Sequence, residues 1–134
     1  MSYGSDVIII DDDPAVIELL EMYCENLGYF RNIIKAKDGS EASKKLFNQQ
    51  FCVILLDVNM PRKTGVDIIR ELSHKDHINN TQSVIIISGE LSKAILTHAM
   101  SKGAKNFLVK PFTEEQFKQK VESVIKTTSP DLLT

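Results

Sequence analysis

The chain has 134 residues, of which 43% are apolar and 25% are charged, and its net charge is -2 at pH 7. This length suits one domain with a substantial core, and the near-neutral charge argues against a general affinity for nucleic acid or for acidic membrane surfaces. The apolar runs are too short to span a bilayer, and the first residues lack the basic and apolar regions of a signal peptide. We therefore expect a cytoplasmic protein.

Five short apolar runs alternate with helical patterns along the chain. The runs "DVIII", "FCVILLD", "SVIIIS" and "NFLVK" are apolar at successive positions, as strands buried on both faces are. The second run, "FRNIIKA", is more polar and indicates an edge strand. Strands that alternate with helices predict βαβ units, a parallel sheet and an α/β fold.

Capping residues mark the ends of the first two expected helices. Asp13 and Pro14 follow the first strand as an N-cap and a proline at the first helical position, and Gly28 suits the end of that helix. The second helix is expected to begin near Asp38, with Glu41 completing a capping box.

The remaining helices are expected after Gly65, over 91–102, and from Thr113, where Gln116 completes a capping box. Residues 127–134 are expected to form a frayed tail or the start of a linker. The chain is thus expected to be a single domain, 1–134, with its core at about 6–126. The last helix turns one apolar stripe to the core: Phe117, Val121, Val124 and Ile125.

The cysteines and histidines show no metal-binding pattern. Cys24 and Cys52 have no CxxC spacing and are predicted to be small core residues. His74, His77 and His98 lie in polar contexts and are predicted to be surface residues.

Polar residues stand at the carboxyl ends of four of the five expected strands. Asp11 and Asp12 follow the first strand, Asp57 ends the third, Ser88 ends the fourth and Lys110 follows the fifth. Ligands of open α/β sheets bind beyond these strand ends, so the pattern predicts one functional site.

Three converging carboxylates require a counter-ion. Two like charges about 4 Å apart repel by roughly 4 kcal/mol at an effective dielectric of about 20. Lys110 offsets one of the charges of Asp11, Asp12 and Asp57, and an all-oxygen site with a few carboxylates suits Mg²⁺. A cation, a lysine and a hydroxyl around one carboxylate provide what phosphoryl transfer to an aspartate needs.

These residues resemble the receiver domain of two-component response regulators, and the chemotaxis type in particular. The resemblance extends from Asp6 to about Lys126 through "VIIIDDDP", "VILLDVNMPRKTGVDIIREL", "VIIISGE" and "GAKNFLVKPF". Pro61 and Gly65 stand four and eight residues after Asp57, as in the family. The resemblance implies a doubly wound, flavodoxin-like (βα)5 domain with the strand order 2-1-3-4-5.

The resemblance also implies a role for each site residue. Asp57 would accept a phosphoryl group from a sensor histidine kinase or a histidine phosphotransfer protein. Asp12, Asp57 and the backbone carbonyl of Asn59 would bind Mg²⁺, and Asp11 would hold it through water. Lys110 would contact the phosphoryl group. Such a domain is a signalling receiver that assists its own phosphorylation and dephosphorylation, not an enzyme acting on other molecules.

Two further residues would transmit the signal. Ser88 would be the switch hydroxyl and Phe107 the aromatic rotamer switch, and the Lys110–Pro111 peptide would be cis. The family more often has threonine, alanine and tyrosine where this chain has Ser88, Gly89 and Phe107. These differences leave the acceptor chemistry intact.

The resemblance to the chemotaxis type, which has the same pairing of asparagine and glutamate, implies that Asn59 and Glu90 flank the path of the hydrolytic water and that the aspartyl phosphate is short-lived.

The output surface is expected on the outer face of the fourth helix, the fifth strand and the fifth helix. An unknown output protein or domain, or a second copy of the chain, would bind there. The fourth helix has an apolar arc of which either Ile95 or Leu96 is expected to be exposed, with Leu96 the favoured one; the alternative is that the whole arc is core. The arc consists of Ala94, Ile95, Leu96, Ala99 and Met100.

Three other interpretations stay open at this stage. The acidic residues could merely cap helices and solvate loops. A flavin-binding domain of the same architecture would need a phosphate-binding loop in place of "DDDPAV". An aspartyl phosphatase usually has a second aspartate where this chain has Asn59. The chain could be a stand-alone receiver or a part of a larger regulator or hybrid kinase.

Overall fold

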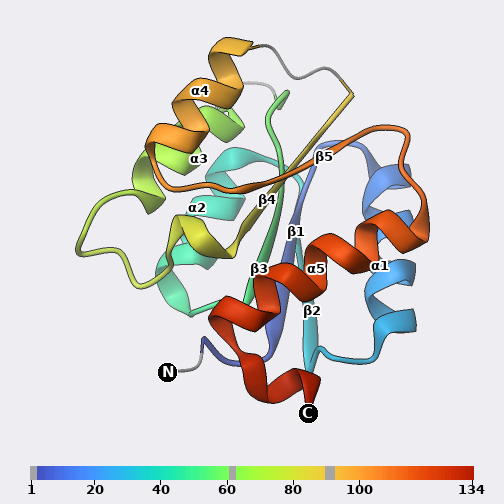
Figure 1. The fold of residues 1–134 in the computed structure, drawn as a ribbon. Helices are drawn as coiled ribbons and strands as arrows, with labels where there is room; N and C mark the ends of the chain where they lie inside the picture. Colours follow the sequence, from blue (N-terminus) through green and yellow to red (C-terminus); the bar gives the residue numbers. More distant parts are fainter. Residues whose placement is uncertain (1–2, 61–62, 90–92) are drawn as a thin grey trace.

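The computed structural model describes residues 3–60, 63–89 and 93–134. Within them, five parallel strands form one sheet in the order β2-β1-β3-β4-β5, which confirms the expected topology (Figure 1). The strands are β1 (Asp6–Ile10), β2 (Asn32–Ala36), β3 (Val53–Asp57), β4 (Val84–Ser88) and β5 (Asn106–Val109).

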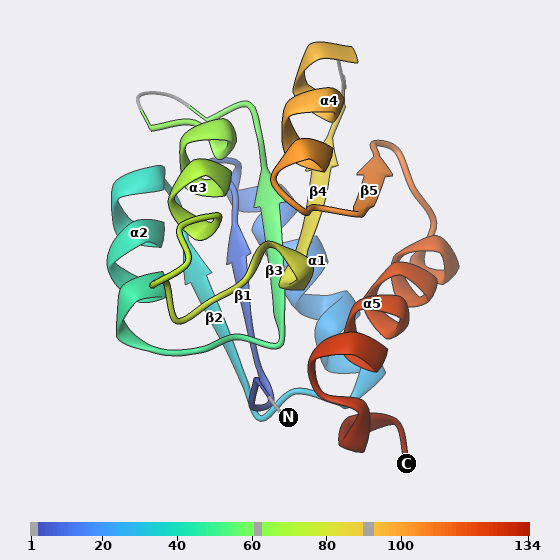
Figure 2. The same cartoon turned by 60° about the vertical axis from the view of Figure 1, so that its left-hand side comes forward.

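Helices cover both faces of the sheet. Helices α1 and α5 pack on one face, and α2, α3 and α4 pack on the other (Figure 2). Two 3-10 helices, η1 (Thr81–Ser83) and η2 (Pro130–Leu133), complete the elements of the described chain. The α-helices are α1 (Pro14–Leu27), α2 (Gly39–Asn48), α3 (Gly65–Leu72), α4 (Lys93–Ser101) and α5 (Glu114–Thr128). None of the helices in the described ranges is both long and apolar enough to cross a membrane.

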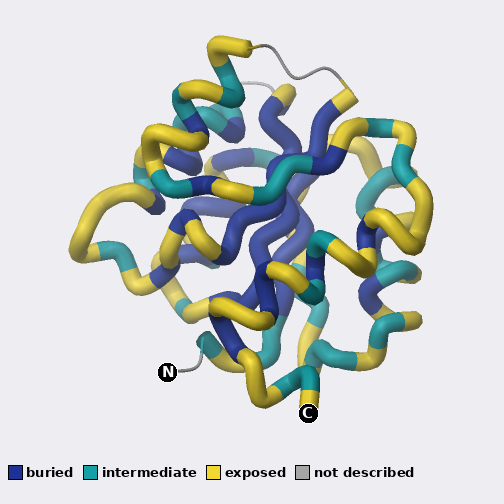
Figure 3. Tube along the Cα trace, in the orientation of Figure 1, coloured by how far each residue is buried: buried dark blue, intermediate teal, exposed yellow. Residues whose placement is uncertain are grey.

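The central strands carry the core, as their continuous apolar sequences predict. Every residue of β3 and β4 is buried, whereas in β2, at one edge of the sheet, only Ala36 is buried (Figure 3). Successive side chains of a strand point to opposite faces, so each central strand contributes to the core on both sides of the sheet. Asp57 and Ser88 therefore stand at the ends of fully buried strands.

Most of the predicted helix ends are present. Asp13 caps α1, and Gly28 ends it with φ of 74°. Asp38 accepts a hydrogen bond from the backbone N–H of Glu41 over 2.7 Å. The capping box would also have the Glu41 carboxylate accept a hydrogen bond from the backbone N–H of Asp38. Instead, that carboxylate lies 2.9 Å from the ammonium of Lys45. Helix α4 is described from Lys93, so its expected first two residues, 91–92, lie outside the described chain.

The capping box of Thr113 and Gln116 at the start of α5 is confirmed, but the expectation of a frayed tail is wrong. The hydroxyl of Thr128 is buried and donates to the carbonyl of Cys52 over 2.8 Å. The hydroxyl of Ser129 accepts from the N–H of Tyr3 over 3.1 Å and donates to the carbonyl of Gly4 over 2.6 Å. The segment after α5 is therefore joined to the chain that precedes β1.

Candidate functional site

Three aspartates from two neighbouring strands form the centre of the site. Asp11 and Asp12 follow β1, and Asp57 is the last residue of β3, which pairs with β1. One carboxylate oxygen of each residue lies within 4.8 Å of those of the other two. Asp11 and Asp57 are buried, while Asp12 is exposed. The structure thus brings together the three acidic residues that the sequence selected.

The carboxylate of Asp11 lies in an environment that opposes its charge. Burial raises the pKa of Asp11, and the nearby Asp57 raises it further. The backbone N–H of Asp13, 2.9 Å away, and the ammonium of Lys110, 3.4 Å away, act in the opposite direction and lower the pKa without cancelling the effect. One lysine does not neutralise three carboxylates, so the cluster favours an additional cation.

Lys110 reaches the cluster from the edge of the sheet. Its backbone N–H donates to the carbonyl of Ser88 over 2.8 Å, which continues the pairing of β5 with β4 beyond the last residue of β5. The Lys110–Pro111 peptide is cis, as expected. The ammonium lies 3.4 Å from Oδ2 of Asp11 and so stands beside the acidic cluster, where it can contact an anion bound there.

Asn59 joins the acceptor strand to the fourth strand. Its backbone N–H donates to Oδ1 of Asp57 over 3.1 Å, and its side-chain amide donates to the hydroxyl of Ser88 over 2.9 Å. The sequence predicts that the backbone carbonyl of Asn59 binds Mg²⁺ and that its side chain lies beside the hydrolytic water. It does not predict the hydrogen bond from the amide to the Ser88 hydroxyl. No local pattern indicates that bond, because the two residues are separated by 29 positions.

Gly65 allows the start of α3 to lie against the loop that follows β3. A Cβ atom at this position would lie 2.7 Å from the carbonyl oxygen of Asp57 and 2.6 Å from Cα of Val58. Such distances are too short for any side chain. The spacing of eight residues that drew attention to Gly65 thus corresponds to a close approach beside Asp57.

Phe107 lies in β5 and is partly buried against the core on the α2–α4 side of the sheet. The expectation for Leu96 is wrong, because Leu96 is partly buried. The exposed apolar side chains of this region are Met100 and Val109, which are 62% and 52% exposed. Glu90 lies outside the described residues.

The cysteines are buried as predicted, and burial raises the pKa of both thiols to about 12, which makes them unreactive. Of the histidines, only His74 is an exposed surface residue; His77 and His98 are partly buried. The ring of His77 lies against that of Phe47 with centroids 4.6 Å apart. Among the described residues, the group of side chains that could hold a metal ion is made of aspartates and includes none of these cysteines or histidines.

The acidic cluster fits a hard divalent cation. Its donors are carboxylate oxygens, and Asp12 is exposed to solvent, so that water can complete the coordination of an ion. Mg²⁺ is commonly held by one or two carboxylates with several waters. The close approach of the three carboxylates and the raised pKa of Asp11 therefore both favour a cation at this edge of the sheet.

A family model described as the response regulator receiver domain matches residues 7–122. This chain belongs to that family. Chemotaxis protein CheY1 of Helicobacter pylori is 30% identical over 122 residues, which cover 90% of this chain and 97% of that protein. Receiver domains are signalling modules with a phosphoacceptor role, so the flavin-binding and phosphatase interpretations give way to this one.

Solved structures of receiver domains have the same fold. The receiver domain of NtrC4, determined as a beryllofluoride-activated dimer, is 33% identical with a TM-score of 0.77 over 91% of this chain and 97% of its own. The receiver domain of the sensor histidine kinase PA1611 from Pseudomonas aeruginosa PAO1 was solved with a magnesium ion coordinated in its active site cleft. It is 20% identical with a TM-score of 0.78, covering 92% of this chain and 98% of its own, and this likeness concerns the fold.

Proposed function

We propose that this receiver accepts a phosphoryl group on Asp57 from a phosphohistidine of a sensor kinase or a phosphotransfer protein in the cytoplasm. The observation that carries the proposal is the convergence of Asp11, Asp12 and Asp57 within 4.8 Å. Asp57 ends a fully buried strand and is itself only 5% exposed, so one carboxylate edge is presented from a rigid support.

Asp11, Asp12, Asp57 and the backbone carbonyl of Asn59 would hold Mg²⁺, with Asp11 acting through water. The ion would supply positive charge that stabilises the phosphoryl oxygens during transfer. Lys110 would contact the phosphoryl group from the β5 side, since its ammonium already lies 3.4 Å from Asp11. An oxygen of Asp57 would attack phosphorus while the histidine nitrogen leaves with the electron pair of the broken P–N bond.

The switch would begin at Ser88. In the structure the amide of Asn59 donates to this hydroxyl, and a phosphoryl group on Asp57 would compete for it as a charged acceptor. Movement of Ser88 would let the ring of Phe107 pack further inward. The change would then reach the α4–β5–α5 face, meaning the outer surface of these three elements, where an output protein or domain or a second copy of the chain would bind.

The aspartyl phosphate would be short-lived. Asn59 is exposed and lies two residues after Asp57. Its small polar side chain would leave room for an attacking water and could donate a hydrogen bond to it, as its amide donates to Ser88 in the structure. Glu90 would act from the other side of the phosphoryl group. Large apolar residues at both positions are expected to slow the loss of phosphate.

The proposal is tested by phosphorylation with acetyl phosphate, followed by intact mass measurement. We expect one phosphate adduct in the presence of Mg²⁺, none in EDTA and none in Asp57→Asn. Asp13→Asn is the matched control, because it removes a neighbouring carboxylate outside the cluster and asparagine still caps α1. An adduct that persists in Asp57→Asn, or that forms equally well in EDTA, would show that the assignment is wrong.

A further inference from the structure

The edge strand β2 also brings a charged residue to the carboxyl edge of the sheet. Ala36 is its last residue and pairs with Ile10 of β1, and the backbone N–H of Asp11 donates to the carbonyl of Ala36 over 3.1 Å. Lys37 therefore follows β2 at the level at which Asp11 and Asp12 follow β1. The sequence does not single out this residue, because lysines are common beside exposed edge strands.

Lys37 and Asp12 line one hollow of about 700 Å³ between α1, β2 and α2. Both residues are exposed, so their side chains are surrounded by water on the outer side. Within the described chain, neither Lys37 nor Asp12 belongs to an ion pair. The ammonium of Lys37 is therefore not held by another carboxylate and shares the hollow with one member of the acidic cluster.

The second lysine of the hollow is already paired. Lys35 of β2 lies 2.9 Å from Glu21 of α1, and Glu41 of α2 lies 2.9 Å from Lys45. Both Glu21 and Glu41 line the same hollow. The acidic lining residues that have no ion pair in the described ranges are Asp12 and Glu18. Asp12 of the cluster is thus one of only two such carboxylates around Lys37.

The acidic cluster accordingly has a lysine on each side along the sheet, in two different settings. Lys110 follows β5, its side chain is 29% exposed, and its ammonium lies 3.4 Å from the buried carboxylate of Asp11. Lys37 follows β2, next to β1, on the side of the exposed Asp12. A charge in such an exposed place acts through its field across water, which salt screens.

Building on the proposed function, we propose that Lys37 lowers the affinity of the site for Mg²⁺ and raises its affinity for the phosphoryl group. The ion would be bound at Asp12 and the phosphoryl group at Asp57, and the field of one ammonium acts on them with opposite signs. At a separation of about 7 Å in water, one unit charge changes the binding of a divalent cation by about fivefold at low ionic strength. The effect on an anion at about 10 Å is roughly twofold.

A structural role of Lys37 predicts a different pattern. If the side chain only supported the turn between β2 and α2, its replacement would disturb the site and weaken the binding of both the cation and the anion. A solvated lysine without influence would change neither. Only a charge close to the site moves the two dissociation constants in opposite directions, so measuring both distinguishes the three roles.

The test determines both constants for the intact protein by NMR, from the amide shifts of residues around Asp57. Mg²⁺ is titrated alone, and beryllofluoride, an anion that mimics the phosphoryl group, is titrated at saturating Mg²⁺. At low ionic strength we expect Lys37→Gln to bind Mg²⁺ about fivefold more tightly and beryllofluoride about twofold more weakly than wild type. Added salt should reduce both differences. Lys37→Arg keeps the charge and should match wild type.

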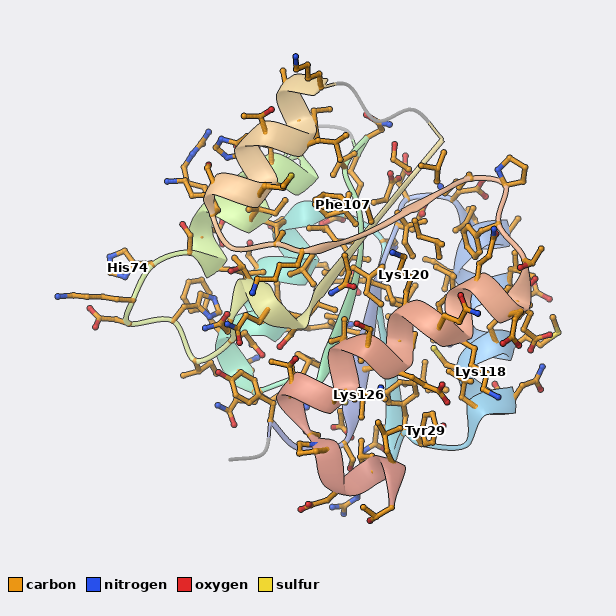
Figure 4. All side chains as sticks on the ribbon, in the orientation of Figure 1. Tyr29, His74, Phe107, Lys118, Lys120 and Lys126 are labelled. Atoms are coloured by element: carbon orange, nitrogen blue, oxygen red, sulfur yellow. The ribbon has the colours of Figure 1, made fainter. Side chains whose placement is uncertain are left out.

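Lys35→Gln and Lys126→Gln are the matched controls. Lys35 lies on the same strand face two positions before Lys37, and its charge is already paired with Glu21. Lys126 is exposed near the end of α5, far from the strand ends that carry the aspartates (Figure 4). Each control removes one positive charge, so an effect of net charge alone would appear in all three variants. We expect both controls to stay within about twofold of wild type.

Opposite changes confined to Lys37→Gln support the proposal. Unchanged constants in Lys37→Gln, weaker binding of both ligands, or changes of equal size in Lys35→Gln would overturn it while leaving the assignment of Asp57 in place. Failure of the proposed function looks different, because the amides around Asp57 of the wild type would then respond to neither Mg²⁺ nor beryllofluoride. That result would overturn both proposals.

Discussion

At the scale of single residues, the amide of Asn59 holds the hydroxyl of Ser88 over 2.9 Å. The proposed switch requires that hydroxyl to turn to the phosphoryl group, so this hydrogen bond opposes activation. Hydrogen bonds of this kind contribute on the order of 1 kcal/mol, which corresponds to about a fivefold change in an equilibrium. If the proposed switch operates, the Asn59 side chain would therefore adjust the balance between the two states without taking part in the transfer.

Asn59→Ala is expected to shift the unphosphorylated protein toward the active state. The backbone carbonyl proposed for Mg²⁺ is retained, while Ser88 loses one donor. The amide shifts of β4 and β5, measured by NMR without beryllofluoride, should move toward those of the loaded protein. Ser88→Ala serves as the comparison, because it removes the hydroxyl itself and should uncouple β5 from loading. Unmoved shifts in Asn59→Ala would contradict this account of the switch.

His77 makes stability depend on pH at the other end of the sheet. Its Nδ1 accepts a hydrogen bond from the backbone N–H of Asn79 over 2.9 Å. The side chain of Asn79 in turn accepts from the N–H of Phe51 and donates to the carbonyls of Leu46 and Gln49. Burial lowers the pKa of His77, so folding favours the neutral ring that can accept this bond.

The sign of the effect follows from the lowered pKa of His77. The contribution of His77 to stability is fully present above its unfolded-state pKa of about 6.5. It is lost as the pH falls from there toward the lower pKa of the folded state. Urea unfolding at about pH 7.5 and about pH 5.5 should show a smaller loss of stability in His77→Gln, because glutamine accepts the bond at both pH values. His74→Gln changes an exposed ring and should lose as much stability as the wild type between these two pH values. The same loss in His77→Gln as in wild type would refute the assignment.

At the scale of elements, the end of α5 is an integral part of the fold. The hydroxyl of Thr128 donates to the carbonyl of Cys52, directly before β3, and Ser129 bonds the chain before β1. These bonds join α5 to the amino-terminal ends of two central strands, at the edge of the sheet opposite Asp57. The helix that borders the proposed output face is thereby anchored at its far end.

Thr128→Val should destabilise the protein by about 1 to 2 kcal/mol, because the carbonyl of Cys52 would be left buried without this donor while the shape of the side chain is nearly kept. Thr127→Val makes the same chemical change at an exposed neighbour and should have little effect. The measurement is the free energy of unfolding in urea. A similar loss in both variants would mean that the buried hydroxyl is not responsible.

At the scale of the whole molecule, the acidic cluster lowers the stability of the metal-free fold. Three carboxylates repel one another, and burial of Asp11 raises its pKa, so the folded state disfavours this charge. A cation that binds the folded state alone relieves the repulsion. Binding of the ion and stability of the domain are therefore linked.

Mg²⁺ at about ten times its dissociation constant should stabilise the protein by about 1.4 kcal/mol, seen as a rise in the thermal unfolding midpoint of several degrees. Asp57→Asn should start from a higher midpoint without metal, because one repelling charge is gone, and should gain little from Mg²⁺. The response of Asp13→Asn should equal that of wild type, since Asp13 lies outside the cluster. An equal rise for Asp57→Asn and wild type would place the ion elsewhere.

Much of the fold and of the site could be predicted from the sequence, because the signals concerned are local. A continuous apolar run is buried on both faces wherever its strand pairs, and Asp13 or Thr113 caps a helix through residues within one turn. Parallel strands bring their carboxyl ends to one edge, so Asp11, Asp12, Asp57, Ser88 and Lys110 could be selected before any distance was known.

Only the tertiary structure decided the features that depend on how separate segments pack. The bond between Asn59 and Ser88, the anchoring of Thr128 and Ser129, and the exposure of Met100 in place of Leu96 have no local signature. Each is set by the rotation and register of one element against another. Amphipathic periodicity limits such a rotation to a range of angles but does not choose within it, because several side chains at the border of the apolar stripe can be buried at similar cost.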